Sequence, residues 1–222
     1  MKTIVITGAG KGIGFETTKQ LLKDNFSVIA ISRNTIQLNS IASKNLQIIQ
    51  GDLTSEIDRI IEEIGMTKID GLLNNAGIII KKDIHSLTYD DFQSVFQTNV
   101  FVPFNLSVRL LNNYNSGAHI INIGSMGGFE NTLKFPEMVF YSSSKSALHC
   151  LSQCLAVEFK GLDVKVNCLS IGSVETEMVK IAFPGFQPPI TSQTMSEFIA
   201  WFLVHGQKFM NGQIIPVALD SI

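Results

Sequence analysis

Short apolar runs alternate along the chain with longer stretches whose apolar positions recur every three to four residues. The apolar runs are rich in Val, Ile and Leu, as strands covered on both faces of a parallel sheet are. Seven are found: Thr3–Thr7, Val28–Ile31, Leu46–Gln50, Gly71–Asn74, His119–Ile123, Val164–Leu169 and Ile214–Val217. Helical spacing covers Gly12–Lys23, Thr54–Ile64, Thr88–Asn112, Tyr141–Phe159 and Met195–Val204. This alternation predicts an α/β fold in which a seven-stranded, doubly wound parallel sheet carries helices on both faces.

Length and composition fit one folded unit. The 222 residues are 45% apolar and 16% charged, so we expect a single domain over residues 1–222. A formal net charge of −2 gives no reason to expect nucleic acid or an anionic membrane as partner. No window approaches the roughly 18 apolar residues of a membrane span, and the first strand follows Lys2 directly, without a signal peptide. We therefore expect a cytoplasmic protein that does not bind a membrane.

The three cysteines, Cys150, Cys154 and Cys168, have no metal-ligand companions nearby, so no metal site is predicted. Cys150 and Cys154 share a helix face at i,i+4. Two buried core thiols are the favoured interpretation there, with a disulfide as the alternative.

A glycine-rich turn follows the first strand: Thr7-Gly8-Ala9-Gly10-Lys11-Gly12-Ile13-Gly14. Such a turn lets the backbone approach a pyrophosphate, and the next helix directs its free N–H groups at it. Glycine clusters also simply close corners between a strand and a helix. Its place between a strand and a helix favours dinucleotide binding on a Rossmann fold.

The end of the second strand bears on which dinucleotide binds. NAD-binding domains usually have an acidic residue there, but no Asp or Glu lies between Asp24 and Asp52. Ser32, Arg33 and Lys11 would instead suit a 2′-phosphate and favour NADP(H), although both cations can also be solvated surface charges. Asp52, followed by Leu53, is either a contact to the adenine amino group or a helix N-cap.

Further motifs occur in a consistent order over nearly the whole chain: Asn74-Asn75-Ala76-Gly77, Asn99, Ser125, Tyr141-xxx-Lys145 and Val174-x-Thr176. Together with the glycine turn they resemble the short-chain dehydrogenases/reductases, and Lys11 with Ser32-Arg33 resembles the NADPH-dependent carbonyl reductases among them. The resemblance implies hydride transfer between NADP(H) and a carbonyl or alcohol substrate, with Asn99, Ser125, Tyr141 and Lys145 as catalytic residues. The cofactor contacts it implies are Thr7, Gly8, Gly10, Lys11, Gly12, Ile13, Gly14, Ser32, Arg33, Asp52, Leu53, Asn75, Ala76, Gly77, Tyr141, Lys145, Gly172, Val174 and Thr176.

The chemistry of the Tyr-Lys pair agrees with that role. Reduction of a ketone needs a proton for the developing alkoxide. Tyr141 and Lys145 share a helix face at i,i+4, and a nearby ammonium is expected to lower a tyrosine pKa from its usual value of about 10. By resemblance, Tyr141 is the general acid, Lys145 also bonds the nicotinamide ribose, Ser125 donates to the substrate carbonyl, and Asn99 helps to hold a water.

Three departures from the family pattern concern the substrate side. Ile171 stands before Gly172 where a proline is usual, which weakens the assignment of Thr176 to the carboxamide; a helix start is its alternative. The stretch Met126–Phe140 is longer than usual, and its aromatic residues Phe129, Phe135 and Phe140 should line one wall of the pocket. Residues 176–192, with four Pro or Gly positions, predict a short substrate loop over a shallow, apolar cleft. Phe183 and Phe186 are its cover or, alternatively, packing anchors.

Two further expectations remain. The apolar residues of Thr88–Asn112 and Tyr141–Phe159 favour a homodimer or homotetramer, although the monomer core buries part of them. A non-catalytic dinucleotide-binding protein, a sensor or regulatory partner, is the alternative function, because a fold alone does not imply activity. The intact set of four catalytic residues argues against it.

Overall fold

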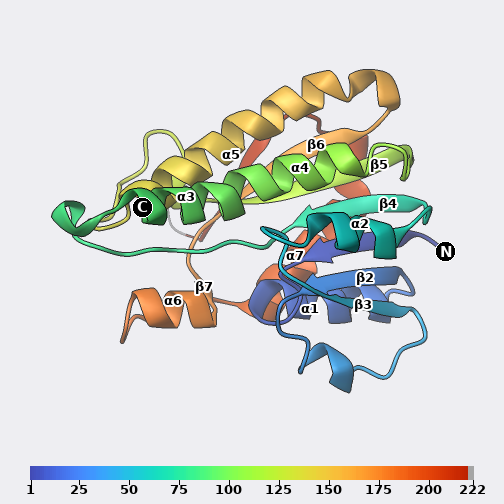
Figure 1. Ribbon diagram of the computed structural model, residues 1–222, viewed down its shortest axis with the longest axis horizontal. Helices are drawn as coiled ribbons and strands as arrows, with labels where there is room; N and C mark the ends of the chain where they lie inside the picture. Colours follow the sequence, from blue (N-terminus) through green and yellow to red (C-terminus); the bar gives the residue numbers. More distant parts are fainter. Residues whose placement is uncertain (220–222) are drawn as a thin grey trace.

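The structure, a computed structural model, describes residues 1–219. Its main sheet has seven parallel strands in the order β3-β2-β1-β4-β5-β6-β9 (Figure 1). Their bounds are β1 (Thr3–Thr7), β2 (Ser27–Ser32), β3 (Leu46–Gln50), β4 (Ile69–Asn74), β5 (Tyr114–Ser125), β6 (Lys165–Ile171) and β9 (Ile214–Val217). Each predicted apolar run forms one of these strands, so the predicted doubly wound sheet is confirmed.

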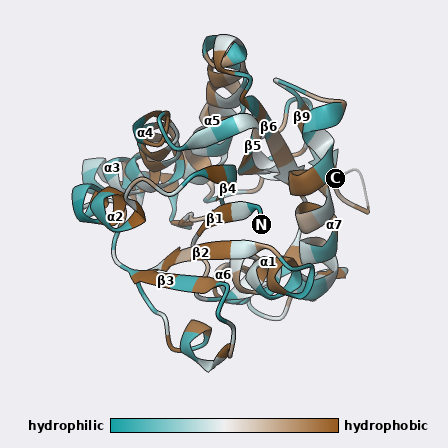
Figure 2. Ribbon diagram, turned by 90° about the vertical axis from the view of Figure 1, so that its right-hand side faces the viewer, coloured by the Kyte–Doolittle hydropathy of each residue, from teal (hydrophilic) through white to brown (hydrophobic). Residues whose placement is uncertain are grey.

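Helices cover both faces of the sheet and enclose two apolar cores. Figure 2 shows α1 (Gly12–Lys23) and α7 (Ser192–His205) on one side, with α2 (Ile57–Ile64), α4 (Val102–Arg109) and α5 (Val139–Glu158) on the other. One core packs Ile13 and Ile199 of the first pair against the sheet. The other packs Ile60, Leu106 and Leu155 against the opposite face. Within residues 1–219, no helix combines the length and apolar character that crossing a bilayer requires.

The helix predicted over Thr88–Asn112 is interrupted. It consists of α3 (Tyr89–Phe96), a π-helical turn η3 (Gln97–Phe101), and α4. Thr88 starts α3 with a reciprocal capping box to Asp91, as its sequence suggests. The interruption has a local cause. Pro103 lacks the N–H that an α-helix would direct at the Asn99 carbonyl four residues earlier.

Other helix boundaries shift by a few residues. The segment predicted to be helical from Thr54 begins as α2 only at Ile57, because the Asp52 carboxylate accepts hydrogen bonds from Thr54 and folds residues 52–56 into a turn. α5 begins at Val139, and α7 begins at Ser192, where Thr191 is the N-cap. The remaining short turns are η1 (Leu38–Ser40), η2 (Ile84–Ser86), η4 (Met126–Gly128), η5 (Lys160–Leu162) and η6 (Gly206–Lys208).

The prediction of an irregular loop at residues 176–192 is wrong in part. The segment contains the helix α6 (Glu177–Ala182), which begins at Thr176, whose hydroxyl accepts from the Val179 amide. Its two ends are joined by a small parallel pair, β7 (Val174–Glu175) and β8 (Ile190–Thr191). In Figure 1, α6 lies at the lower left of the molecule, apart from α3 and α5.

The prediction that Cys150 and Cys154 are buried is also wrong. Both thiols are exposed, whereas Cys168 on β6 is buried. The inward face of α5 carries Lys145, Leu148, His149 and Ser152 instead. Because apolar and small residues occur all round this helix, its sequence did not distinguish the two faces.

Candidate active site

A cleft of about 770 Å³ lies along the carboxyl ends of the central strands, where doubly wound sheets bind their ligands. Arg33 and Asp52 bound one end, after β2 and β3, and Tyr141 and Lys145 of α5 bound the other. The predicted site residues that line it are Gly8, Lys11, Gly12, Ile13, Ser32, Arg33, Asp52, Leu53, Asn75, Ala76, Gly77, Ser125, Tyr141, Lys145, Gly172, Val174 and Thr176.

Two residues that do not line the cleft, Thr7 and Gly14, hold the turn after β1 in place. Gly8 has φ +65°, and a Cβ on Gly14 would lie 2.5 Å from the Gly8 carbonyl oxygen. The Thr7 hydroxyl accepts from the amides of Asn75 and Ala76, each at 3.0 Å. In return, the Asn75 side chain donates to the Thr7 carbonyl at 3.0 Å. Thr7 and Gly14 therefore hold the turn against the end of β4, which leaves the start of α1 facing the cleft.

Gly10 also has a packing role in this turn. A Cβ there would lie 2.1 Å from the Asn34 carbonyl oxygen and 2.4 Å from the Ser32 hydroxyl. Only a glycine lets the turn approach the end of β2 this closely. Ser32, which lines the cleft, therefore packs directly against Gly10.

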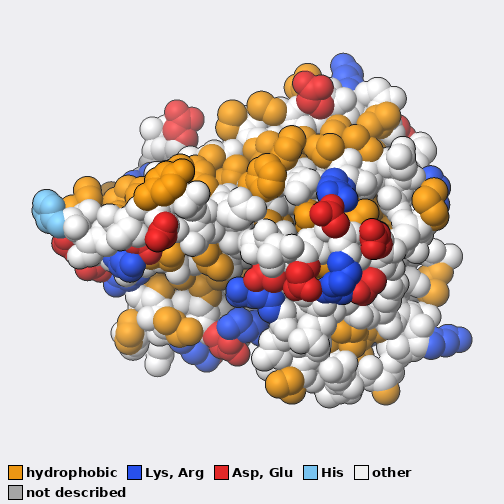
Figure 3. Space-filling model, viewed as in Figure 1, with side chains coloured by type: hydrophobic (Ala, Val, Ile, Leu, Met, Phe, Trp, Pro, Cys, Tyr) orange, Lys and Arg blue, Asp and Glu red, His pale blue; other side chains and the backbone are white. Residues whose placement is uncertain are grey.

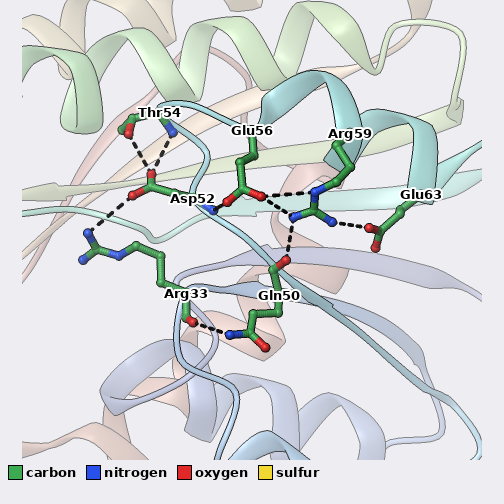
Figure 4. A network of polar contacts seen from close by, with 7 residues as sticks. All are labelled: Arg33, Gln50, Asp52, Thr54, Glu56, Arg59 and Glu63. Carbon is green, nitrogen blue, oxygen red and sulfur yellow. Dashed lines mark hydrogen bonds and ion pairs between the residues drawn. The ribbon is translucent and has the colours of Figure 1, made fainter.

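Lys11 and Arg33, the two cleft cations proposed to bind a 2′-phosphate, are each paired with a carboxylate. The Lys11 ammonium lies 2.6 Å from a Glu177 oxygen at the start of α6. The Arg33 guanidinium lies 3.6 Å from Asp52, in the network of Figure 4 that continues through Glu56 and Arg59. The sequence did not reveal either pair. The two members of the first pair are 166 positions apart.

The Asp52 carboxylate is held in a defined orientation. It accepts from the Thr54 amide at 2.9 Å and from the Thr54 hydroxyl at 2.7 Å. Burial opposes its ionisation, but these hydrogen bonds and Arg33 outweigh burial and lower the pKa of Asp52. The N-cap of α2 is Glu56, so the N-cap prediction for Asp52 is wrong.

Tyr141 and Lys145 lie side by side on α5 at the end of the cleft opposite Arg33 and Asp52, which is called the inner end. The Lys145 ammonium is 5.8 Å from the centroid of the Tyr141 ring and donates to the Ile123 carbonyl at 2.7 Å. Ser125, at the end of β5, accepts from the Gly127 amide at 3.1 Å. The end of β5 therefore places a carbonyl and a hydroxyl next to the two α5 side chains.

The ionisation of this pair differs from the sequence expectation. Burial raises the pKa of Tyr141, and a hydrogen bond with Ser125 offsets only part of that effect. Burial also lowers the pKa of Lys145 to about 8. The expected acidification of the phenol by its helix neighbour is not found in this structure, because burial dominates and the ammonium is bonded to the Ile123 carbonyl.

Asn99 lies behind the cleft, fully buried in η3. Its side chain accepts from the Ile78 amide at 2.8 Å and donates to the Ile78 carbonyl at 2.9 Å and to Ser144 at 3.0 Å. A Cβ on Gly77 would lie 3.2 Å from the Asn99 side-chain oxygen and 3.6 Å from the Lys145 ammonium. Asn99 therefore joins three elements, the segment after β4, η3 and α5.

The β6–α6 connection brings Gly172 and Thr176 to the cleft. Gly172 donates its amide to the Val217 carbonyl at 2.9 Å, so β9 holds the backbone where the family's proline is missing. Thr176 caps α6, as its alternative interpretation predicted, and still faces the phosphate turn: a Cβ on Gly12 would lie 3.5 Å from its methyl group. The sequence missed Glu177, Met178 and Val179 as cleft residues, although a Thr before a short apolar run is a helix-start signal.

The predicted aromatic wall is not found among the described residues that line the cleft. Phe129 packs against His149, and Phe140 packs edge-on against Phe92. Phe135 instead contacts Phe183 at a ring separation of 6.0 Å, which joins the stretch before α5 to the end of α6. Phe183 is thus a packing anchor, and each ring is occupied by another aromatic partner.

The fold and this cleft define a Rossmann-fold oxidoreductase. Residues 2–185 match the family model described as short chain dehydrogenase, and the chain belongs to that family. An uncharacterized oxidoreductase of Staphylococcus aureus (strain USA300) is 28% identical over 97% of this chain and 96% of its own length.

Two solved structures resemble the chain closely. 4-Hydroxyisoleucine dehydrogenase complexed with NADH has a TM-score of 0.88 at 26% identity, and covers 98% of this chain and 97% of its own. ElxO with NADP bound has a TM-score of 0.80 at 26% identity, with the same coverage.

Proposed function

We propose that the protein transfers a hydride between NADP(H) and a carbonyl or alcohol substrate, with Tyr141 as the general acid and base. One observation carries this proposal: the Tyr141 phenol, the Ser125 hydroxyl and the Lys145 ammonium lie together at one end of the same cleft that the glycine-rich turn lines. A binding protein has no need of a proton donor at that place.

The residues present fit a dinucleotide. Gly8, Gly12 and the start of α1 offer backbone N–H groups to a pyrophosphate. Thr176 and Val174 face the inner end, where the nicotinamide would lie, and Asp52 and Leu53 face the adenosine end. The cofactor supplies the hydride; the protein's task is to bind it, exclude water and move one proton.

The chain's own residues account for the proton. A phenol with a raised pKa remains protonated at neutral pH and is ready to donate to a developing alkoxide. The phenolate that results is stabilised by the Lys145 ammonium, and Ser125 donates to the same substrate oxygen. Asn99, whose side chain lies against the same Gly77 position as the Lys145 ammonium, is suited to hold a water on the Lys145 side.

The choice of NADP(H) over NAD(H) rests on Lys11, Ser32 and Arg33, with no carboxylate between Asp24 and Asp52. The two similar solved structures contain different cofactors, NADH in one and NADP in the other. Arg33→Ala is expected to reduce the preference for NADPH over NADH, measured as the ratio of the two dissociation constants by fluorescence titration. An unchanged ratio would refute the proposed phosphate contact.

The Tyr141→Phe variant tests the catalytic proposal. It keeps the ring and removes only the proton donor, so NADPH affinity should be retained while turnover of a carbonyl panel falls by about 100-fold or more. The panel contains a simple ketone, an α-dicarbonyl, a quinone and a 3-oxoacyl thioester. Turnover that survives in the variant would show that another group donates the proton.

We also propose a cytoplasmic homo-oligomer, either a dimer or a tetramer. Figure 3 shows apolar side chains gathered along α3, α4 and α5. Phe101 of η3 and Phe104 of α4 are 47% and 40% exposed, and between Val139 and Val157 the exposed face of α5 carries no charge. The proposed cytoplasmic location has a separate basis: Cys150, Cys154 and Cys168 are free thiols, which suit a reducing compartment. Sedimentation at micromolar concentration tests the assembly, and a monomer would contradict it.

A further inference from the structure

Residues 124–129, which carry Ser125, rest directly on α5. A Cβ on Gly128 would lie 2.6 Å from the Ser146 amide nitrogen and 2.7 Å from the Lys145 Cβ. The Ser146 hydroxyl donates to the Gly128 carbonyl at 2.6 Å. The path of this segment is therefore set by the α5 side chains beneath it, one turn further along the helix than Tyr141.

His149 lies under the same segment and contacts it on both sides of Ser125. Before Ser125, the ring nitrogen Nε2 would lie 2.5 Å from a Cβ on Gly124, so the imidazole fills the space that glycine leaves. After Ser125, the ring packs edge-on against Phe129, with centroids 6.1 Å apart. The side chain is 5% exposed. Lys145 of α5 also contacts both flanks, through the Ile123 carbonyl and the Gly128 position, but it lines the cleft, whereas His149 does not.

The surroundings of His149 keep it uncharged. Burial and the nearby Lys145 ammonium lower the pKa of His149 to about 4, and Lys134 acts in the same direction. The Gly128 backbone opposes this by accepting a hydrogen bond. The buried Cys168 thiol of β6 faces the same Gly124 position, where a Cβ would be 2.8 Å away. A neutral ring at this place fills space and orients the backbone; it is not suited to carry a proton.

We propose that His149 is a positioning residue that holds Ser125 in place for the substrate carbonyl, by bracing Gly124 on one side and Gly128 and Phe129 on the other. The proposal rests on the proposed carbonyl chemistry at Ser125 and Tyr141. His149 lies eight residues after Tyr141 and four after Lys145, on the same face of α5. It does not line the cleft, and it acts only through the backbone that carries Ser125.

His149→Ala removes the brace, His149→Gln keeps a neutral side chain of similar reach, and Cys150→Ser changes the adjacent exposed position as a control. We expect His149→Ala to lower kcat by about 10- to 100-fold per NADPH-binding site, because a displacement of about 1 Å costs rate in that range. The NADPH dissociation constant should stay within about twofold, since His149 does not line the cleft. His149→Gln should restore most of kcat, and Cys150→Ser should match the wild type.

Hydrogen–deuterium exchange gives an independent readout that needs no substrate. Peptides covering residues 124–129 should exchange faster in His149→Ala, while those of α1 should not. If exchange of residues 124–129 is unchanged in His149→Ala, the positioning role is refuted. It is also refuted if the wild type is active on the panel and His149→Ala has the same kcat per site. If instead the wild type reduces nothing in the panel, the proposed function fails, and the exchange result alone decides whether His149 positions the segment.

Discussion

His119 should make the protein less stable in mild acid. The ring is fully buried on β5. Its Nδ1 lies 3.1 Å from the Leu203 carbonyl and its Nε2 lies 2.9 Å from the side-chain nitrogen of Asn167. That nitrogen also donates to the Met210 carbonyl, and the Asn167 oxygen accepts from the Gln213 amide. Asn167 is thus fixed as a donor, so Nε2 must remain an acceptor and the imidazole must remain neutral.

The magnitude follows from the change in proton affinity. Burial lowers the pKa of His119 from 6.5 to about 4. Below pH 6.5 the unfolded chain binds a proton that the folded protein does not, so the free energy of unfolding falls with pH until about pH 4. One such group removes about 2 kcal/mol between pH 7 and pH 5, and about 3 kcal/mol in all. His149, with its pKa lowered to a similar value, adds a loss of the same sign.

Urea unfolding of the wild type and the His119→Gln variant at pH 7 and pH 5 tests this. The amide of Gln offers an acceptor to Asn167 and a donor to Leu203, but does not titrate. The free energy of unfolding should differ between pH 7 and pH 5 by about 2 kcal/mol less in the variant than in the wild type, whatever the variant's absolute stability. A pH dependence equal to that of the wild type would refute the reasoning. His149→Gln is the matched comparison, and it should remove only the part of the pH dependence that comes from His149.

Two further predictions concern the phosphate turn. Glu177→Gln frees Lys11 and should tighten NADPH binding by up to about fivefold at low salt, because an exposed ion pair contributes about 0 to 1 kcal/mol. Binding is measured by calorimetric titration. Equal or weaker binding in the variant would contradict the idea that Glu177 competes with the cofactor for Lys11. Gly14→Ala places a Cβ 2.5 Å from the Gly8 carbonyl oxygen and should lower the free energy of unfolding by about 1 to 3 kcal/mol. Gly161→Ala, where nothing lies within 4 Å, is the control, and equal unfolding midpoints for the two variants would count against the packing argument.

The strands were the most predictable part of the fold. A central strand covered on both faces is apolar along most of its length, and the run Thr3–Thr7 matches the bounds of the buried strand β1. The edge runs Leu46–Gln50 and Ile214–Val217 also match the observed bounds, although they are less buried. The break in the Thr88–Asn112 helix was also predictable in principle, since Pro103 removes one backbone donor. The exposure of Cys150 and Cys154 was not, because the residues on both faces of α5 have similar polarity.

The candidate site was predictable where one segment contains both partners. Tyr141 and Lys145 are four residues apart on one helix, and the glycines of the phosphate turn lie within a single loop. Contacts between distant segments were not predictable. No local pattern distinguishes Glu177 from other surface carboxylates as the partner of Lys11, and the brace from His149 to Gly124 depends on how α5 packs on β5.

The two ion pairs limit how strongly the cleft can distinguish the two dinucleotides. Arg33 is 71% exposed in its side chain and lies 3.6 Å from Asp52, so their attraction is worth at most about 1 kcal/mol. A hydrogen bond from a guanidinium to a phosphate contributes about 1.5 to 3 kcal/mol, which exceeds that amount. If the proposed NADP(H) binds, its 2′-phosphate would displace Asp52 from Arg33, and separating the pair would offset part of the free energy gained. We accordingly expect a preference for NADPH of about tenfold, and a preference of a thousandfold would mean that Arg33 and Lys11 are not held by their carboxylates in solution.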